Sequence, residues 1–376
     1  MPSKIINHKQ QPINGQPSGL KLPQKRSSNK VVLWMVGITL ATVVGLVAGL
    51  LIWYNIQLSP AGNDVSRLKK ITIPPGSTSS QISKELENQS IIRNAFVFDI
   101  YVRLSCKNKP LQAGTYRLSP PEAVPKIIEH FVKGSVDKFS ITFYPGATLT
   151  DNSKKSESKK LDVTSVLKRA GFSDKEIKVA LEKTYTGPLF ASKPPNTELE
   201  GYVYGETYNF NAGSSVEAIL NGTFKEFYAK IQENGLVKGF ANHGLNLYQG
   251  ITLASIIQRE ANKAKDQRQV AQVFYTRLAI GMPLGSDVTY QYIADKTGVA
   301  RDPSLDSIYN TRIHAGLPPG PIASPGMSAL LAVANPASGD YQFFLSGDDG
   351  VMYFSRTNAE HDANIVNHCK VNCSTP

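Results

Sequence analysis

The sequence predicts an α+β protein with three parts: an N-terminal transmembrane helix, a small strand–helix–helix–strand module, and a larger mixed α/β domain. Three observations predict it. Residues 31–54 carry no charged side chain, the pattern I-T-x-x-P-G-x-T occurs at both 71–78 and 141–148, and from Glu200 onward apolar helical stretches alternate with turns rich in Gly and Pro. A chain of 376 residues has room for roughly two or three domains.

The apolar stretch predicts a single membrane crossing. Residues 31–54 are long enough to span a bilayer as a helix, which takes about 20 residues. Trp34, Trp53 and Tyr54 lie near its two ends, where interfacial aromatic side chains are common. A cleaved signal peptide is the alternative, but the apolar core is too long and no small-residue cleavage site follows it. We therefore expect a single-pass protein of the cell membrane, with every residue after Tyr54 outside.

The charge distribution predicts a cytoplasmic N-terminus. Residues 1–30 contain no acid, and they supply six of the net +11 charges: Lys4, Lys9, Lys21, Lys25, Arg26 and Lys30. Basic flanks stay on the cytoplasmic side of a crossing, and the polar composition of this segment predicts a disordered tail. The rest of the chain has no basic cluster interleaved with aromatic residues, which argues against a nucleic-acid partner.

After a linker at 55–70, residues 71–138 predict the small module. The sequence ITIPPGST at 71–78 fits a short strand that ends in a Pro-Gly turn. Ile82 and Leu86 have helical spacing, residues 95–104 read as a second apolar helix, and residues 111–118 as a second strand. This order is the outline of a LysM-like module. The second copy of the pattern, ITFYPGAT, predicts another strand and turn followed by a helix start.

The larger domain is expected at 139–368, with its core at 200–368. Polar residues 150–160 predict a solvated loop. Helices are expected at 214–231, with Ser214 as the N-cap, and at 250–264 and 267–280. Three prolines in GLPPGPI at 316–322 exclude a regular helix or a central strand, and residues 341–345 and 351–354 predict a β-hairpin.

The C-terminal tail at 369–376 contains Cys369 and Cys373, which lie four residues apart. A small local disulfide would form there in an oxidising compartment. Two free thiols are the equally open alternative. The third cysteine, Cys106, gives no Cys/His spacing typical of a metal site.

Glu260 occupies the most informative position. On a helix that turns by about 100° per residue, Leu253, Ile256 and Ile257 form an apolar stripe, and Glu260 falls inside it. A buried carboxylate is costly unless it is paired or protonated, and burial raises its pKa. A general acid needs that property at neutral pH. The alternative is a structural glutamate at the helix end that meets a nearby base at the surface.

Six motifs resemble the endolytic murein transglycosylase family, also called YceG-like or MltG. They occur in the family's order and together span roughly residues 71–368. EGYVYGETY at 200–208 resembles the family's EGFLFPDTY, LASIIQRE at 253–260 resembles LxASIVEKE, and VFYTRL at 273–278 resembles VFxNRL. GMPLGSD at 281–287 resembles GMxLQSD, and YNT at 309–311 with GLPPGPI at 316–322 resembles YNTYxxxGLPPGPI. FSRTNAEH at 354–361 resembles FSxTxxEH.

The resemblance implies a membrane anchor, a LysM-like module and a YceG-like catalytic domain, and it makes Glu260 the catalytic glutamate. The first Glu of the family's EKE is Gln258 here, but that position lies outside the apolar stripe. Other departures concern substrate contacts more than the fold: Gly205 for Pro, Glu206 for Asp, Thr276 for Asn and Gly285 for Gln.

Further acidic, basic and hydroxyl residues of these motifs are expected to bind substrate: Glu200, Tyr208, Arg277, Ser286, Asp287, Asn310 and Thr311. Each has an alternative as a hydrogen-bonding residue of the core. His361 beside Glu360 near a helix start is more typical of a structural residue than of metal chemistry. Neither a metal nor another cofactor is expected.

The implied activity is that of a lytic transglycosylase, a lyase that cuts between N-acetylmuramic acid and N-acetylglucosamine without water. Glu260 would protonate the leaving oxygen and then accept a proton from the muramic C6 hydroxyl, which closes a 1,6-anhydro ring. Cutting nascent strands would terminate glycan elongation. The expected partners are peptidoglycan glycan strands, the cytoplasmic membrane and peptidoglycan synthases. The alternatives are a water-using muramidase with two carboxylates and a non-catalytic peptidoglycan-binding scaffold.

Overall fold

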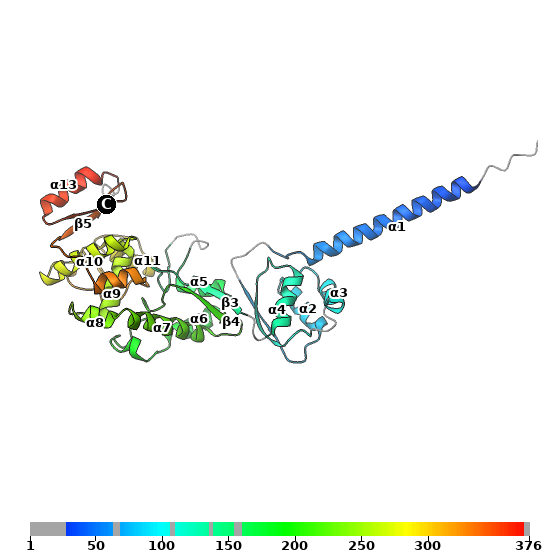
Figure 1. Ribbon diagram of the computed structural model, residues 1–376, viewed down its shortest axis with the longest axis horizontal. Coiled ribbons are helices and arrows are strands. Elements are labelled where there is room, and N and C mark those ends of the chain that lie inside the picture. The colour runs from blue at the N-terminus through cyan, green and yellow to red at the C-terminus, as the bar shows by residue number, and fades with distance from the viewer. Residues whose placement is uncertain (1–27, 63–67, 106–109, 135–137, 154–159, 372–376) are drawn as a thin grey trace, which may run out of the picture. The chain divides into compact units, whose positions relative to one another are not determined.

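The computed structural model describes residues 28–62, 68–105, 110–134, 138–153 and 160–371 (Figure 1). The chain divides into two compact units, residues 1–56 and 57–376. The described part of the first unit is helical, and the second unit contains all of the strands in the described residues.

Helix α1 (Ser28–Leu58) contains the predicted crossing at 31–54 and extends it at both ends. Residues 30–58 are apolar and long enough to cross a membrane, and none of this stretch is buried within the protein. A signal sequence near an N-terminus would share these properties. Residues 28–30 are helical rather than part of a tail, and the predicted tail at 1–27 lies outside the described residues.

The predicted strand–helix–helix–strand order is confirmed. Strand β1 (Lys69–Ile73) pairs antiparallel with β2 (Gly114–Leu118). Helices α2 (Ser79–Asn88) and α3 (Ala95–Ser105) come between them in the chain. A capping box starts α2, because the side chains of Thr78 and Gln81 each accept a hydrogen bond from the other's backbone N–H.

A further helix, α4 (Val124–Lys133), follows β2 and was not predicted. It belongs to the same hydrophobic cluster, in which Ile71, Leu86, Phe98 and Phe131 are fully buried. The ring of Phe131 makes an edge-to-face contact with Tyr116 of β2, with centroids 4.7 Å apart. This core therefore depends on α4 as well as on the predicted elements.

A second, larger hydrophobic cluster has buried members from Phe139 to Ala334. Strand β3 (Lys138–Thr142) pairs antiparallel with β4 (Thr207–Asn211), and β5 (Phe343–Ser346) pairs antiparallel with β6 (Met352–Ser355). Helices predominate, in the order α5 (Val163–Arg169), α6 (Asp174–Glu182), η3 (Pro188–Phe190), α7 (Val216–Glu233), α8 (Leu236–Ala241), α9 (Leu247–Glu260), α10 (Ala264–Ala279), α11 (Asp287–Thr297), α12 (Met327–Ala334) and α13 (Asn358–His368). The described part is thus mixed α and β, as predicted.

Helix α9 is the central element of this cluster. Every residue from Leu247 to Ile257 is buried except Gln249. The helix contacts α8, α10, α11 and α12, which gather around it in Figure 1. Gly250 lets α8 approach, because a Cβ there would lie 2.2 Å from the ring of Phe240. A helix enclosed in this way holds its last residue, Glu260, in a defined place.

Several predicted boundaries differ from the structure. The N-cap of α7 is Ser215, whose Oγ accepts from the N–H of Ala218, and not Ser214. Helices α9 and α10 each begin three residues before their predicted starts. The hairpin at β5–β6 is confirmed, and the GLPPGPI segment is neither helix nor strand. Of the predicted loop at 150–160, residues 154–159 lie outside the described residues.

The helix expected after the second Pro-Gly turn is absent from the described residues, since α5 begins only at Val163. Non-local bonds explain the difference. The N–H of Gly146 donates to the carbonyl of Ser324 over 2.7 Å, and the N–H of Ser324 donates to the carbonyl of Ala147 over 2.8 Å. Backbone groups that a helix would need are therefore engaged by a distant segment.

Arg117 of β2 joins the two hydrophobic clusters. Its guanidinium lies 3.7 Å from the ring centre of Phe172 and 4.7 Å from that of Phe139. It donates hydrogen bonds to the carbonyls of Ala170 and Ala212. Burial lowers the pKa of Arg117 to about 10, which leaves it charged at neutral pH.

Candidate active site

Glu260 is the last residue of α9, at the end of the predicted apolar stripe. Leu253, Ile256 and Ile257 are fully buried, as the helical pattern predicted. Glu260 itself is partly exposed. The residue that carries the acid thus lies at the edge of the buried stripe.

Ser286 holds the Glu260 carboxyl group. Its Oγ donates a hydrogen bond to Glu260 Oε1. Ser286 is buried at the start of α11, where its N–H donates to Thr311 Oγ1 over 3.1 Å and its carbonyl accepts from Thr289 Oγ1 over 2.7 Å. These backbone bonds fix the hydroxyl group that contacts the acid.

Desolvation raises the pKa of Glu260 to about 7. The negative charge of Asp287 raises it as well, whereas the bond from Ser286 and the charges of Arg259 and Arg277 lower it. Near neutral pH this carboxyl group therefore exists in both forms. A group with such a pKa can donate a proton and afterwards take one back.

Arg277 of α10 is buried behind the acid. It donates hydrogen bonds to the carbonyls of Leu284 and Gln342, and its guanidinium lies 5.4 Å from the ring centre of Phe343. Its bonds to backbone groups tie α10 to the segment before α11 and to β5. Arg277 thus contributes positive charge near Glu260 from a structural position.

Asp287 and Asn310, which follow Ser286 in the chain, make different contacts. Asp287 is about half exposed and forms an ion pair with Arg312, with 2.5 Å between Oδ1 and Nη1. Asn310 is fully buried, and its Nδ2 donates to the carbonyls of Pro303 and Leu305, each over 2.9 Å. The structure thus brings Ser286, Thr311 and Asp287 to the Glu260 carboxyl region, while Asn310 shapes the loop beside them.

Two of the predicted substrate residues lie elsewhere. Glu200 is 5% exposed, and it accepts hydrogen bonds from the N–H of Leu149 over 3.0 Å and from the hydroxyl group of Tyr292 over 3.1 Å. Burial raises its pKa to about 7 as well. Tyr208 of β4 donates to the carbonyl of Tyr204 over 3.1 Å and packs among aromatic rings. Both residues support the fold around the site.

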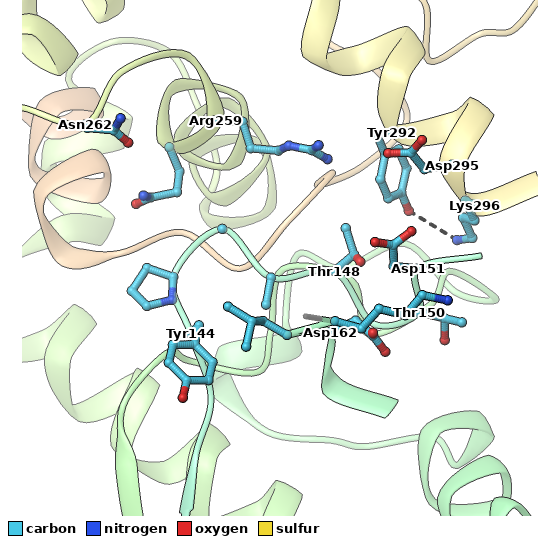
Figure 2. A pocket seen from close by; sticks show the side chains of 16 residues that line it. Tyr144, Thr148, Thr150, Asp151, Asp162, Arg259, Asn262, Tyr292, Asp295 and Lys296 are labelled. Carbon is cyan, nitrogen blue, oxygen red and sulfur yellow. Dashed lines mark hydrogen bonds between the residues drawn. The ribbon is translucent and has the colours of Figure 1, made fainter. Parts of the chain in front are cut away.

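A polar cavity of about 390 Å³ opens beside the last turn of α9 (Figure 2). Its walls are the segment from Tyr144 to Asp151, residues 160–162, the end of α9 and one face of α11. Figure 2 shows Arg259 extending from α9 toward Tyr292 and Asp295. Arg259 was not predicted as a site residue, although a base beside the acid in the EKE-like motif was a usable signal.

Gln258 has a structural role that explains the departure from the family's EKE. Its Oε1 accepts a hydrogen bond from the N–H of Gly326 over 2.9 Å, at the start of α12. Two further side chains on the same helix hold the preceding loop, since Ser255 Oγ accepts from the N–H of Ile322 over 2.9 Å and the Tyr248 hydroxyl donates to the carbonyl of Pro319 over 3.0 Å. A Gln and a Glu can both accept such a bond.

The C-terminal region contains the two remaining predicted features. His361 of α13 stacks against Phe343, with ring centres 5.3 Å apart, and burial lowers its pKa. The described residues contain no group of three or more His, Cys, Asp or Glu suited to a metal ion. Cys369 is disulfide-bonded, so it is not the free thiol of one alternative; Cys106 and Cys373 lie outside the described residues.

Comparison with protein families gives one match, which covers most of the chain. The sequence profile of the YceG-like family matches residues 71–367. The matched stretch contains the α9 acid, the Ser286 loop and the GLPPGPI segment.

Known proteins agree with this match. An endolytic murein transglycosylase of Bacillus subtilis is 31% identical over 334 residues, which cover 84% of this chain and 89% of that protein. An endolytic murein transglycosylase of Streptococcus pneumoniae is 25% identical over 83% of this chain, which spans only 60% of that protein's length. The crystal structure of a YceG-like protein from Listeria monocytogenes matches with a TM-score of 0.50 and 27% identity, over 79% of this chain and 99% of that one.

Proposed function

The chain belongs to the YceG-like family, and on that premise we propose that it is an endolytic murein transglycosylase acting on peptidoglycan glycan strands. The names of its relatives support this assignment. The observation that carries it is Glu260, a partly exposed residue whose carboxyl pKa is raised to about 7 by desolvation and whose carboxyl group accepts a hydrogen bond from Ser286. Such a group suits acid catalysis at neutral pH.

In the first step, protonated Glu260 donates its proton to the glycosidic oxygen between N-acetylmuramic acid and N-acetylglucosamine. The bond from the muramic C1 to that oxygen breaks, and the N-acetylglucosamine end leaves with a hydroxyl group. Positive charge develops at C1 while Glu260 becomes a carboxylate. The hydrogen bond from Ser286 and the charge of Arg277 stabilise this carboxylate.

In the second step, the Glu260 carboxylate takes the proton of the muramic C6 hydroxyl, and the C6 oxygen bonds to C1. The product is a 1,6-anhydro ring, water is not consumed, and Glu260 is protonated again. One carboxyl group suffices, because the nucleophile is part of the substrate and attacks within the same molecule. Asp287 is engaged with Arg312 and serves as a nearby charge in this scheme.

We propose α1 as a membrane anchor that keeps the enzyme at the outer face of the cytoplasmic membrane, with the basic N-terminus inside. Such a tether brings the site to strands that are still being synthesised, so cleavage there terminates their elongation. Peptidoglycan synthases are the corresponding partners. The module at 71–138, which we propose to be LysM-like, would guide the strand or support the catalytic part.

The test uses the full-length protein in detergent with purified glycan strands. Glu260→Gln removes the proton donor but keeps an oxygen that can accept from Ser286. Glu233→Gln makes the same chemical change at an exposed position in the last turn of α7, outside the six motifs. We expect Glu260→Gln to lower the cleavage rate by about 100- to 10,000-fold and Glu233→Gln to keep it within a few-fold.

Mass spectrometry of the new strand ends separates the alternatives. Anhydromuramic ends from the wild type and from Glu233→Gln, but not from Glu260→Gln, would support the proposal. Ordinary reducing ends would identify a water-using muramidase. Strand binding without cleavage by any of the three proteins would identify a scaffold.

A further inference from the structure

Arg259 has a guanidinium group that is attracted by the charges of Asp295, Glu200 and Asp151 but makes no hydrogen bond to any of the described residues. It immediately precedes Glu260 and lines the cavity beside α9 (Figure 2). Within the described ranges, no hydrogen bond or ion pair involves its side chain. Burial lowers the pKa of Arg259. A partly buried cation left without hydrogen bonds is unfavourable, which points to a ligand that supplies them.

Each acid that lines the same cavity accepts a hydrogen bond from another residue, although the second carboxylate oxygen of Asp162 is buried without one. Asp295 accepts from Arg301 through both oxygens, over 2.9 Å and 2.6 Å. Asp162 Oδ1 accepts from the N–H of Ser165 over 2.9 Å, at the start of α5, and Asp151 Oδ1 accepts from the N–H of Ser153 over 2.8 Å. The planar fork of Arg259 therefore remains open toward the cavity, and a carboxylate is the group that matches it in two parallel hydrogen bonds.

The overall charge of the cavity restricts the ligand further. Its walls hold three acids and three bases: Asp151, Asp162, Asp295, Lys160, Arg259 and Lys296. A balanced lining of this kind suits a ligand with separate negative and positive groups better than it suits a multiply charged anion such as a diphosphate. A volume of about 390 Å³ has room for a short peptide segment.

We propose that this cavity binds the peptide stem, the short peptide attached to muramic acid, and that Arg259 pairs with a stem carboxylate. The inference rests on the proposed function and names a second part of the substrate. Stems carry both carboxylate and amino groups. They are attached to the sugar whose C1 bond is cut, so a stem site must lie close to the acid. Consecutive residues of a helix satisfy that requirement, because their Cα atoms are about 3.8 Å apart and their side chains diverge by about 100°.

The experiment compares two substrates with the full-length enzyme. One is glycan strands with intact stems, and the other is the same strands stripped by an amidase, which leaves a free lactyl carboxylate. The variants are Arg259→Leu, which removes the fork, and Arg259→Lys, which keeps a charge but not the bidentate geometry. Lys265→Leu removes an equal charge from an exposed position of α10 outside the cavity.

The readout is the ratio of kcat/KM on intact strands to kcat/KM on stripped strands. A ratio is needed because Arg259 also affects the pKa of Glu260, and both substrates experience that change equally. We expect the wild type and Lys265→Leu to favour intact strands by about 10- to 100-fold. Arg259→Leu should bring the ratio close to one, and Arg259→Lys should give an intermediate value.

The outcomes are separable from those of the proposed function. Equal cleavage of both strands by the wild type would overturn the stem site and leave the transglycosylase intact. If Arg259→Leu loses more kcat/KM on stripped strands than on intact strands, Arg259 pairs with the lactyl carboxylate, and the stem site is overturned in that case too. Failure to cleave either strand would overturn the proposed function itself. If Arg259→Leu does not fold, Arg259→Lys provides the test. A kcat/KM ratio equal to that of the wild type in Arg259→Lys would contradict a bidentate contact between Arg259 and the stem.

Discussion

Two carboxyl groups of this protein, Glu260 and Glu200, have pKa values raised to about 7 by burial, yet their surroundings differ. Glu200 is 5% exposed and accepts hydrogen bonds from a backbone N–H and from the Tyr292 hydroxyl. Glu260 is partly exposed, and a single serine orients it. A raised pKa therefore does not identify the acid by itself, and access from solvent separates the two groups.

The pH profile of kcat/KM tests the environment of Glu260. Because the protonated form is the donor, activity should fall as pH rises past about 7. Ser286→Ala removes a bond that stabilises the charged form, so the alkaline limb should move to higher pH. Asp287→Asn removes a negative charge that disfavours the charged form, so the limb should move to lower pH. Shifts in the same direction, or no shift in either variant, would contradict this account.

Helical periodicity predicted which face of α9 carries Glu260, and the structure places that residue beside the buried stripe. Periodicity states which residues share a face, but not what lies opposite them. The contact with Ser286 joins residues 26 apart in sequence. The position of Glu200, tied to Leu149 and Tyr292, also depends on long-range packing. For that reason the fold-supporting role of Glu200 could not be read from its motif.

At the scale of elements, α9 positions the acid and also anchors the proline-rich segment. Tyr248, Ser255 and Gln258 contact the backbone at Pro319, Ile322 and Gly326, in order along both segments. Three prolines make this segment stiff and poor in N–H donors. Of the N–H groups that remain, those of Ile322 and Gly326 donate to side chains of the helix, and that of Ser324 donates to the carbonyl of Ala147.

Substitution at Gln258 tests this anchoring. Gln258→Glu keeps an acceptor at the N-terminus of α12, where a negative charge is also favourable, so activity should stay within a few-fold of the wild type. Gln258→Leu leaves the N–H of Gly326 without its partner, which costs about 1 to 3 kcal/mol. Its melting temperature and activity should both fall. Activity lost in Gln258→Glu and retained in Gln258→Leu would refute an acceptor role.

Helices α4 and α12 were not predicted from the sequence, for different reasons. Helix α4 has its signal in the sequence, because Val124, Ile127, Ile128 and Phe131 follow helical spacing and are buried. Helix α12 reads MSALLAVA, and five of its eight residues are buried. A short apolar run of that kind cannot be told from a strand by periodicity. Its helical state depends on α9 and α10, which pack against it.

Arg117 offers a test of how the two clusters of the second unit are joined. Arg117→Met keeps much of the volume between Phe139 and Phe172 but leaves the carbonyls of Ala170 and Ala212 without their donor. The free energy of unfolding of residues 57–376 should fall by about 2 to 4 kcal/mol in urea titrations followed by circular dichroism.

The control is Lys70→Ala, which breaks the exposed ion pair with Glu176 between the same two regions. Exposed pairs contribute less than about 1 kcal/mol, so this variant should stay close to the wild type. Equal effects of the two substitutions would show that charge alone, and not the buried guanidinium, joins the clusters.

Across the whole molecule, the apolar stretch at 31–54 predicts a helix separate from the rest of the chain, and the structure divides the chain into units at residues 1–56 and 57–376. Composition is sufficient to locate this helix, because an uncharged apolar stretch of this length near an N-terminus suits a membrane helix or a signal sequence. Orientation is a separate inference that depends on the bases in residues 1–30.

Protease protection tests that orientation. In intact spheroplasts, a tag at the N-terminus should be protected from added protease, whereas residues after α1 should be digested. Replacing the six bases of residues 1–30 by Gln should weaken the preference for a cytoplasmic N-terminus, because positively charged flanks determine the orientation of a membrane helix. A cytoplasmic protein serves as the control for intact membranes. Digestion of the N-terminal tag in intact cells would contradict the proposed topology.

We propose that Glu260 catalyses strand cleavage without the addition of water, and a reaction run in water labelled with heavy oxygen distinguishes this mechanism from hydrolysis. The proposed mechanism predicts anhydromuramic ends that contain no label, because the C6 oxygen of the substrate closes the ring at C1. Labelled oxygen at C1 of reducing muramic ends would show that water is the nucleophile and would contradict the account.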